Sequence, residues 1–374
     1  MLPLAPAVGL NRRSDSSAGR PLTTTNRPET GPDRAPEPVA PETAREVTAW
    51  LRRIGLAGPR EEPLFTTLPG GVSSEIWRVD LARGPVCIKR AIAKLKVEQD
   101  WFAPIERSTY EVRWFRTAGA IEPGCVPEVL GVDEERHMFA MAFLDPATHR
   151  LWKSELRDGH ADPAFAALVA RKLVHIHAAT AHRPDIAAQF PTDAIFHALR
   201  LESYLEATAR RHADLAPRLH ALVATTAKTK HALVHGDVSP KNIMIGPNGP
   251  VFLDAETAWY GDPAFDVAFC LNHLLLKCLW TPQAARGFLA CFDALAETYL
   301  AGVAWEEPAE IEGRVAALVP GLFLARIDGK SPVEYVTREA DKDRVRRVAR
   351  PLIAAPPARL SQVRGAWAAE IGIV

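Results

Sequence analysis

A polar loop followed by an apolar hairpin constrains the fold of this chain more than any other segment. The loop has the sequence HGDVSPKN at residues 235–242, and the hairpin ends in VFLDAE at residues 251–256. Asn242 stands five positions after Asp237, and Asp254 directly follows a short apolar strand. This order predicts a loop and a hairpin that present three oxygen-bearing side chains.

The spacing is that of the catalytic loop of kinases, and phosphoryl transfer explains the residue types. Asp237 would orient the attacking hydroxyl and accept its proton, while Asn242 and Asp254 would hold Mg²⁺ on the nucleotide phosphates. Oxygen ligands suit that hard cation. The alternative is a loop whose polar residues only cap turns, and Asn248-Gly249 is indeed a hairpin turn signal. Several independent matches in the right order favour the catalytic interpretation.

The segment resembles the aminoglycoside phosphotransferase superfamily of small-molecule kinases, whose continuation matches GDPAFD at residues 261–266. The acidic DAE in place of Asp-Phe-Gly, followed by WYG, is most similar to methylthioribose kinase-like members. The resemblance spans about residues 64–335. It implies that Glu256 joins the metal site; the alternative is a structural ion pair with a nearby arginine. Asp266 is predicted to bond the catalytic loop from the next helix.

The fold class that follows is α+β, a two-lobed protein-kinase-like fold with a small β-rich N-lobe and a larger, mainly helical C-lobe. Residues 1–42 are rich in proline and poor in large apolar residues, which predicts a disordered tail. Short strand patterns around one helix near 105–118 predict a nucleotide-binding antiparallel sheet within residues 43–144. Residues 145–374 are mostly helical in pattern, and we expect them to hold the catalytic loop and the acceptor site.

The predicted strand VCIK ends in Lys89, where kinases place their phosphate-pairing lysine. Its ion-pair partner is expected on the following helix. We choose Glu111 because it lies in the apolar-periodic part of that helix, and the alternative is a solvent-facing glutamate. The hinge between the lobes should follow the apolar strand MFAMAFL at residues 138–144, with backbone groups near Phe143 reading the adenine edge.

A glycine- and serine-rich turn lies between the first two predicted strands, where kinases place their phosphate-covering loop. It is not the usual G-x-G-x-x-G pattern. In this position we expect Gly70, Gly71, Ser73 and Ser74 to contact the nucleotide phosphates.

The acceptor is predicted to be a small molecule. Only a few residues separate Glu256 from the helix expected near Ala264, so there is no segment to dock a peptide. The predicted activity is transfer of the ATP γ-phosphate to a hydroxyl of a sugar-like or amino-alcohol acceptor, a methylthioribose-like compound included. Arg326, in RIDGKSP, resembles an Arg-x-x-Gly segment of methylthioribose kinases, which implies a substrate contact. A surface ion pair is the alternative for Arg326.

Two other functions stay open. A pseudokinase would bind nucleotide without chemistry, although Lys89, Asp237, Asn242 and Asp254 are all present. An aminoglycoside-inactivating kinase would present an acidic cleft to its cationic substrate. The near-neutral helical part gives no clear acidic surplus for such a cleft.

The composition of the chain limits which partners it can bind and in which cell compartment it can work. The 374 residues include 45 Lys and Arg and 45 Asp and Glu, and this zero net charge disfavours nucleic-acid binding, which usually needs a basic surplus. Charged residues interrupt every apolar run before the roughly 20 residues of a membrane helix. The five cysteines form no CxxC pair, which fits a reducing compartment. We expect a cytoplasmic enzyme that uses ATP and Mg²⁺, and whether it forms a homodimer stays open.

Overall fold

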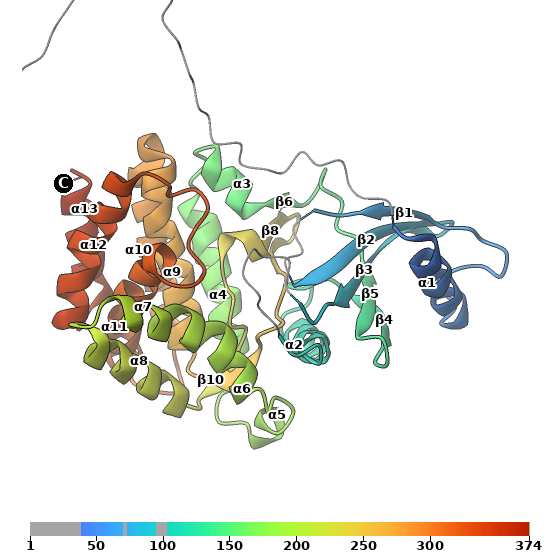
Figure 1. Ribbon diagram of the computed structural model, residues 1–374, viewed down its shortest axis with the longest axis horizontal. Coiled ribbons are helices and arrows are strands. Elements are labelled where there is room, and N and C mark those ends of the chain that lie inside the picture. The colour runs from blue at the N-terminus through green and yellow to red at the C-terminus, as the bar shows by residue number, and fades with distance from the viewer. Residues whose placement is uncertain (1–38, 70–72, 95–102, 374) are drawn as a thin grey trace, which may run out of the picture. The chain divides into compact units, whose positions relative to one another are not determined.

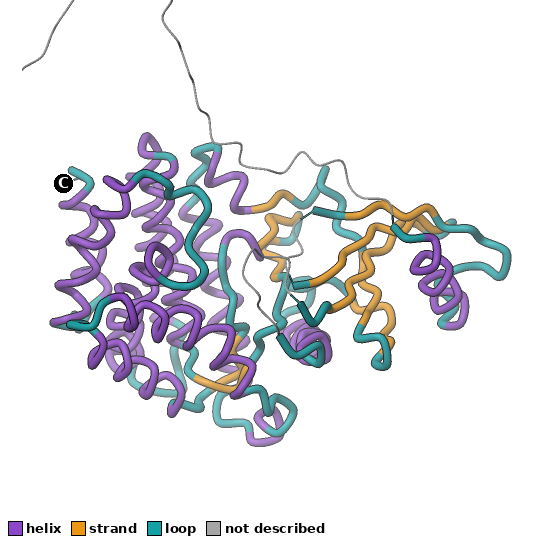
Figure 2. The backbone as a smooth tube through the Cα atoms, viewed as in Figure 1, coloured by secondary structure: helices purple, strands orange, loops and turns teal. Residues whose placement is uncertain are grey.

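The computed structural model describes residues 39–69, 73–94 and 103–373, which belong to one compact unit. Strands dominate the N-terminal part and helices the C-terminal part (Figures 1 and 2). The predicted α+β organisation is therefore confirmed. The predicted tail falls mostly outside the described residues, and the boundary at residue 144 stays a prediction.

The N-terminal part is built on an antiparallel five-stranded sheet with the strand order β1-β2-β3-β5-β4. In chain order its elements are α1 (Pro41–Arg53), β1 (Leu64–Thr67), β2 (Ser74–Leu81), β3 (Gly84–Ala91), α2 (Arg107–Ile121), β4 (Val129–Asp133) and β5 (Met138–Ala142). Helix α1 begins at a proline, a residue favoured in the first helical turn because its missing N–H has no partner there anyway. It therefore starts two residues inside the predicted tail.

Alternation along the central strand β3 decides which side chains face which helix, because successive residues of a strand point to opposite faces. Ile88 belongs to a hydrophobic cluster with Trp50 of α1. Cys87 belongs to a different cluster with Trp114 of α2. Lys89, two positions after Cys87, therefore lies on the face covered by α2.

The C-terminal part is mostly helical, with short strands around the predicted catalytic loop. Its elements are β6 (Arg150–Leu151), α3 (Trp152–Arg157), α4 (Pro163–Thr180), α5 (Pro184–Ala187), α6 (Asp193–Phe196), the π-helical η1 (His197–Glu206), α7 (Ala207–Arg211), α8 (Ala216–Lys228), β7 (Ala232–Val234), the 3₁₀ turn η2 (Pro240–Asn242), β8 (Ile243–Gly246), β9 (Gly249–Phe252), β10 (Trp259–Gly261), α9 (Ala264–Trp280), the 3₁₀ turn η3 (Pro282–Ala284), α10 (Ala285–Ala301), α11 (Pro308–Asp328), α12 (Glu339–Ala354) and α13 (Leu360–Glu370).

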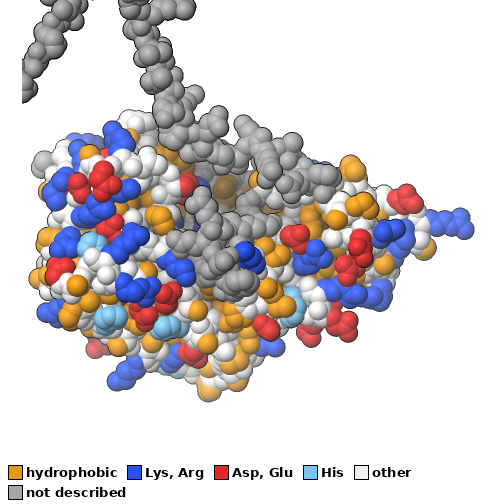
Figure 3. All heavy atoms as spheres, in the orientation of Figure 1, with side chains coloured by type: hydrophobic (Ala, Val, Ile, Leu, Met, Phe, Trp, Pro, Cys, Tyr) orange, Lys and Arg blue, Asp and Glu red, His pale blue; other side chains and the backbone are white. Residues whose placement is uncertain are grey.

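Helix α9 is the centre of this part, because almost every residue along it is buried. It packs against α10 and α11. Among the described residues, no helix is long and apolar enough to cross a membrane. Figure 3 shows cationic and anionic side chains interspersed over the visible face.

Candidate active site

The predicted catalytic loop connects β7 to β8, and its conformation depends on a glycine. Gly236 has φ +80°, and a Cβ there would lie 2.5 Å from the carbonyl oxygen of Thr257. Only glycine fits both conditions. The chain is thereby turned so that Asp237 is presented at the start of the loop.

Antiparallel pairing of β8 with β9 brings the two predicted metal ligands to one end of the hairpin. Asn242 immediately precedes β8, and Asp254 stands two residues after β9. The Leu253 N–H donates to the Asn242 carbonyl at 2.8 Å, which extends the pairing past the strands. The Asn242 Nδ2 donates to the Asp237 carbonyl at 3.1 Å, so its Oδ1 is the atom left for a cation.

Asp266 at the start of α9 holds the catalytic loop, as predicted. Its carboxylate accepts from the backbone N–H groups of His235 at 2.7 Å and Gly236 at 2.8 Å. The His235 ring adds a second support, with Nε2 3.1 Å from the Leu253 carbonyl and Nδ1 3.1 Å from the Asp237 N–H. Burial lowers the pKa of His235, and a neutral ring with one donor and one acceptor satisfies both contacts.

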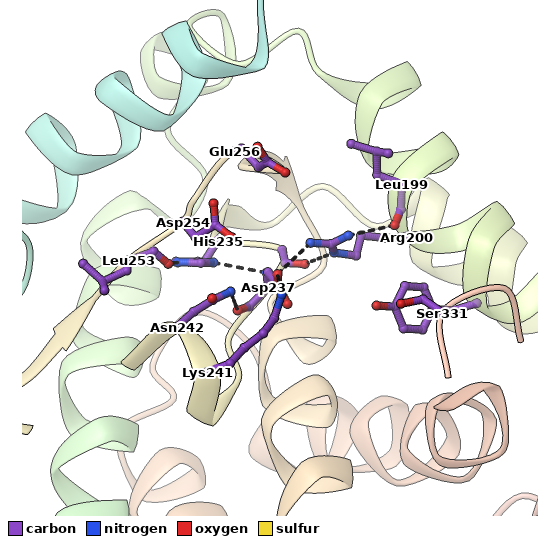
Figure 4. A network of polar contacts seen from close by, with 12 residues as sticks. Leu199, Arg200, His235, Asp237, Lys241, Asn242, Leu253, Asp254, Glu256 and Ser331 are labelled. Atoms are coloured by element: carbon purple, nitrogen blue, oxygen red, sulfur yellow. Dashed lines mark hydrogen bonds and ion pairs between the residues drawn. The ribbon is translucent and has the colours of Figure 1, made fainter. Parts of the chain in front are cut away.

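The Asp237 carboxylate lies between two cations (Figure 4). Its Oδ2 is 3.0 Å from Nη2 of Arg200 and 3.1 Å from Nζ of Lys241. Arg200 comes from the π-helical η1, a rare geometry that is frequent at functional sites. Sequence reasoning missed Arg200, because it precedes Asp237 by 37 positions and belongs to no motif. It also left Lys241 unassigned, although this lysine lies within the loop.

Lys89, Glu111 and Asp254 form an ion-paired triad, of which Lys89 and Glu111 are buried. The Lys89 Nζ is 2.8 Å from Glu111 and 2.5 Å from Asp254. Burial raises the pKa of Glu111 to about 7, although Lys89 acts against this shift. Burial also acts to raise the pKa of Asp254, but Lys89 and Lys241 outweigh it and hold that pKa well below its ordinary value. The structure thus brings the predicted lysine and its chosen partner together.

Asp254 differs from its two partners in conformation and exposure. Its φ is +64°, in the left-handed region that non-glycine residues rarely adopt. Its side chain is 30% exposed, whereas Lys89 and Glu111 are almost fully covered. Unusual backbone conformations of this kind often occur at functional sites. The turn leaves the Asp254 carboxylate facing both Lys89 and the open side of the loop.

Glu256 forms an ion pair with an arginine, which is the alternative named for it. Its Oε2 is 2.9 Å from Nε of Arg107, at the start of α2, and the Arg107 side chain is completely buried. Arg107 also donates to the carbonyl of Ser73, just before β2, and to the carbonyl of Ile92, just after β3, at 2.8 Å, which ties α2 to both segments. The metal-ligand role of Glu256 stays a prediction, with only its Oε1 outside this pair.

Of the other residues predicted to contact the nucleotide, the structure describes the serines and Phe143 but not the two glycines. Gly70 and Gly71 lie outside the described residues. Ser74 is the first residue of β2 and is buried. Phe143 directly follows β5 and is half-buried, and the Arg78 guanidinium lies 4.9 Å from the centre of its ring. Their contacts with a nucleotide stay predictions.

Arg326 lies on α11 and is only 8% exposed, so it is not the surface ion pair that the sequence left open. Its Nη1 donates to the Tyr204 hydroxyl at 3.2 Å and to the Ser331 hydroxyl at 3.0 Å. Tyr204 belongs to η1, the same segment as Arg200. Arg326 is therefore connected through Tyr204 to the segment that contacts Asp237.

Comparison with known proteins decides the family. The model of the phosphotransferase enzyme family matches residues 65–297. The chain belongs to this family. It is 26% identical over 277 residues to methylthioribose kinase of Yersinia enterocolitica, which covers 65% of this chain and 68% of that protein. It is 28% identical over 286 residues to methylthioribose kinase of Pectobacterium carotovorum, which covers 68% and 69% of the two chains.

A solved structure supports the kinase-like fold. The choline kinase of Cryptosporidium parvum superposes with a TM-score of 0.51 at 12% identity, over 83% of this chain and 96% of that one. The predicted recognition and fold are thus confirmed, as is the general activity, that of a small-molecule kinase. ATP is the substrate that this activity implies.

Proposed function

We propose that this phosphotransferase moves the γ-phosphate of ATP to a hydroxyl group of a small acceptor, with Asp237 as the catalytic base. The observation that carries the proposal is the position of Asp237 in the loop that Asp266 holds, where Asn242 donates to the Asp237 backbone carbonyl and the Asp237 carboxylate faces Arg200 and Lys241. In this assignment Asp237 orients the acceptor hydroxyl and takes its proton. Positioning and proton transfer of this kind are what a phosphotransferase must supply, because the phosphate needs little covalent assistance.

Arg200 and Lys241 are proposed to complete the reacting centre. The Asp237 Oδ2 is 3.0 Å from Nη2 of Arg200 and 3.1 Å from Nζ of Lys241, and these two contacts hold the carboxylate in one orientation. The Lys241 side chain is 48% exposed, so it can also face a substrate. Fixed cations close to a transferring phosphoryl group stabilise the charge that develops on its oxygens.

Lys89 is proposed to pair with the nucleotide phosphates. Glu111 and Asp254 hold its ammonium group at a defined point on the face of the sheet covered by α2. Contacts with the nucleotide phosphates are also proposed for Gly70, Gly71, Ser73 and Ser74. The backbone near Phe143 is proposed to read the adenine edge.

Mg²⁺ fits the donor atoms that the loop and the hairpin offer. Asn242 Oδ1 and the Asp254 carboxylate are hard oxygen ligands, and Mg²⁺ is usually bound by one or two such protein groups together with substrate phosphates. The described residues contain no cluster of three or more His, Cys, Asp or Glu side chains that could hold a metal without a substrate. When bound, the cation would neutralise phosphate charge. Because Arg107 already pairs with Glu256, we assign Glu256 to that ion pair first. A titration of the reaction rate with Mg²⁺ tests whether Glu256 also binds the cation.

The acceptor is proposed to be a hydroxylated small molecule bound between η1 and α11, with Arg326 as a contact. The names of the two relatives make methylthioribose the first compound to test. Cations lie around Asp237, which disfavours a cationic aminoglycoside. The intact triad of Lys89, Glu111 and Asp254 is an argument against a pseudokinase.

ATP consumption by the full chain tests this function. The acceptors are methylthioribose, other sugars, amino alcohols and aminoglycosides, each with and without Mg²⁺, and Asp237→Asn is the matched inactive variant. We expect acceptor-dependent ADP formation that needs Mg²⁺ and Asp237. Stabilisation by ATP that is independent of Mg²⁺, with no turnover of any acceptor, would instead identify a pseudokinase.

A further inference from the structure

His273 is buried on α9, and Lys277 follows it by one helical turn, so the two side chains lie on the same face of that helix. After burial of the ring itself, the positive charges of Arg326, Lys277, Lys241 and Lys153 hold the pKa of His273 well below its ordinary value. We call these four residues the cationic cluster. They come from α11, α9, the catalytic loop and α3, so they meet only in the folded chain.

Carboxylates of the described part of the protein pair with only two members of the cationic cluster. Lys241 pairs with Asp237, and Lys153 pairs with Glu334. The other two members of the cluster have no carboxylate within 4.0 Å among the described residues. Arg326 is bonded to Tyr204 of η1, and η1 also carries Arg200, which contacts Asp237, so this uncompensated charge lies beside the segment that reaches the proposed catalytic base.

Lys277 shows this imbalance most clearly. It is 1% exposed, and its Nζ lies 3.9 Å from the ring centres of both Trp280 and Tyr335, which are stacked on one another. Burial first, and then Lys153, lower the pKa of Lys277 to about 6. A buried cation without a counter-ion is costly, and the amine gives up its proton instead. A bound anion would remove that cost.

Unused hydrogen-bonding atoms accompany the cations. His273 Nε2, Arg326 Nε and the Tyr335 hydroxyl are buried and have no hydrogen-bond partner. Buried polar atoms are nearly always paired, so each unpaired one calls for an explanation. The arginine nitrogen can only donate, and the tyrosine hydroxyl can donate as well. These two donors, together with the basic groups of Lys277 and Arg326, suit a ligand group that carries several acceptor oxygens, and a negative charge on that group would favour the protonated form of Lys277.

We propose that the acceptor of this enzyme carries an anionic group, a carboxylate or a phosphate monoester, which Lys277 and Arg326 bind while its hydroxyl lies at Asp237. The proposal rests on the proposed function and narrows its acceptor class. An ammonium group would add a further positive charge to a site that already lacks counter-ions. A neutral sugar would leave the cations and the unpaired donors without partners. Figure 4 shows the reacting end of this site, where Arg200 and Lys241 approach Asp237 and Ser331 lies beyond Arg200.

Matched polyols test the inference. For chains of three, five and six carbons, the neutral alditol, its aldonate, its monophosphate and its amino derivative are compared as acceptors of ATP–Mg²⁺ with the full chain. We expect at least one aldonate or monophosphate to exceed its alditol and its amine tenfold or more in kcat/KM. Lys277→Met should remove that preference mainly through KM, and Lys228→Met, at an exposed lysine of α8, should leave it unchanged. A neutral or cationic member that is turned over best, or a preference that survives Lys277→Met, would overturn the inference.

Thermal-shift measurements distinguish a failure of the anion site from a failure of the proposed phosphotransfer. Stabilisation by ATP–Mg²⁺ reports on the nucleotide site, and stabilisation by each anionic polyol, compared with its alditol, reports on Lys277 and Arg326. If no polyol is turned over, an anion-specific shift that Lys277→Met abolishes still supports the anion site, although the proposed function has then failed. No anion-specific shift and no anion-specific turnover would refute the anion site, even if a neutral acceptor is phosphorylated.

Discussion

Glu256→Gln separates a structural ion pair from a metal ligand at the Asp-x-Glu turn. In the structure Arg107 holds the Glu256 carboxylate at 2.9 Å, and only the second oxygen of Glu256 is outside that pair. If the ion pair is the main role, glutamine should lower stability and leave the Mg²⁺ requirement nearly unchanged. Asp254→Asn should do the opposite, because Asp254 is proposed to bind the cation directly.

The magnitude follows from what Arg107 keeps after the substitution. Breaking a buried pair costs about 3–5 kcal/mol when the partner charge is left alone. Here the glutamine amide oxygen can still accept from Arg107, which also keeps four carbonyl acceptors, those of Ser73, Ile92, Ala103 and Pro104. We therefore expect a loss of about 1.5–3 kcal/mol, the range for one hydrogen bond to a charged group. In a large domain this lowers Tm by roughly 2–6 °C.

The assay is a titration of the reaction rate with Mg²⁺ at fixed ATP, together with a melting curve for each variant. We expect Glu256→Gln to keep the half-saturating Mg²⁺ concentration within about threefold, and Asp254→Asn to raise it about tenfold or more, equivalent to 1.4 kcal/mol of lost binding. Glu297→Gln, at an exposed glutamate of α10, is the matched control. A tenfold higher Mg²⁺ requirement in Glu256→Gln, with an unchanged Tm, would refute the ion-pair assignment and establish Glu256 as a ligand.

Three further predictions concern the base, the triad and the buried lysine. Asp237→Asn should lower kcat about 10²–10⁴-fold and leave ATP affinity, measured by calorimetry, within a few-fold; a variant that keeps most of its activity would remove Asp237 from the base role. Lys89→Met should weaken ATP binding. Because the pKa of Glu111 is about 7 even beside Lys89, Glu111 should take up a proton in this variant, so the stability loss should stay below the roughly 3–5 kcal/mol of a stranded buried charge. The double variant with Glu111→Gln should match the single variant in stability and should not recover the affinity. Burial lowers the pKa of Lys277 from its ordinary 10.5 to about 6 in the folded chain. Between these two pH values the lysine carries a proton in the unfolded chain but not in the folded one. The free energy of unfolding therefore rises with pH in this interval. Denaturation of the wild type and Lys277→Met at pH 6 to 9 gives the free energy of unfolding of each protein. The difference between them should shift in favour of the wild type by up to about 1.4 kcal/mol per pH unit. The same dependence on pH in both proteins would contradict a buried, deprotonated lysine.

The catalytic loop and the hairpin after it could be predicted from residue order because their geometry is local. Asp237, Asn242 and Asp254 are placed by one loop and one antiparallel pair of strands, so the spacing between them carries the information. The same applies to Lys89, whose face follows from alternation along β3, and to Asp266 in the first turn of α9. In each case the neighbouring residues set the position of the side chain.

The partners of these residues were decided by tertiary structure. Arg107 lies 149 positions before Glu256, and Arg200 lies 36 positions before the Gly236 carbonyl that it contacts. In sequence an arginine or lysine on a helix predicts a solvated face, because exposed positions of helices are usually charged. Lys277 on α9 contradicts that expectation, because it is buried against the rings of Trp280, at the end of α9, and Tyr335, in the segment between α11 and α12. Burial and the sum of nearby charges depend on which distant segments pack together, and this long-range packing determines both the cations around Asp237 and the charge balance of the acceptor side.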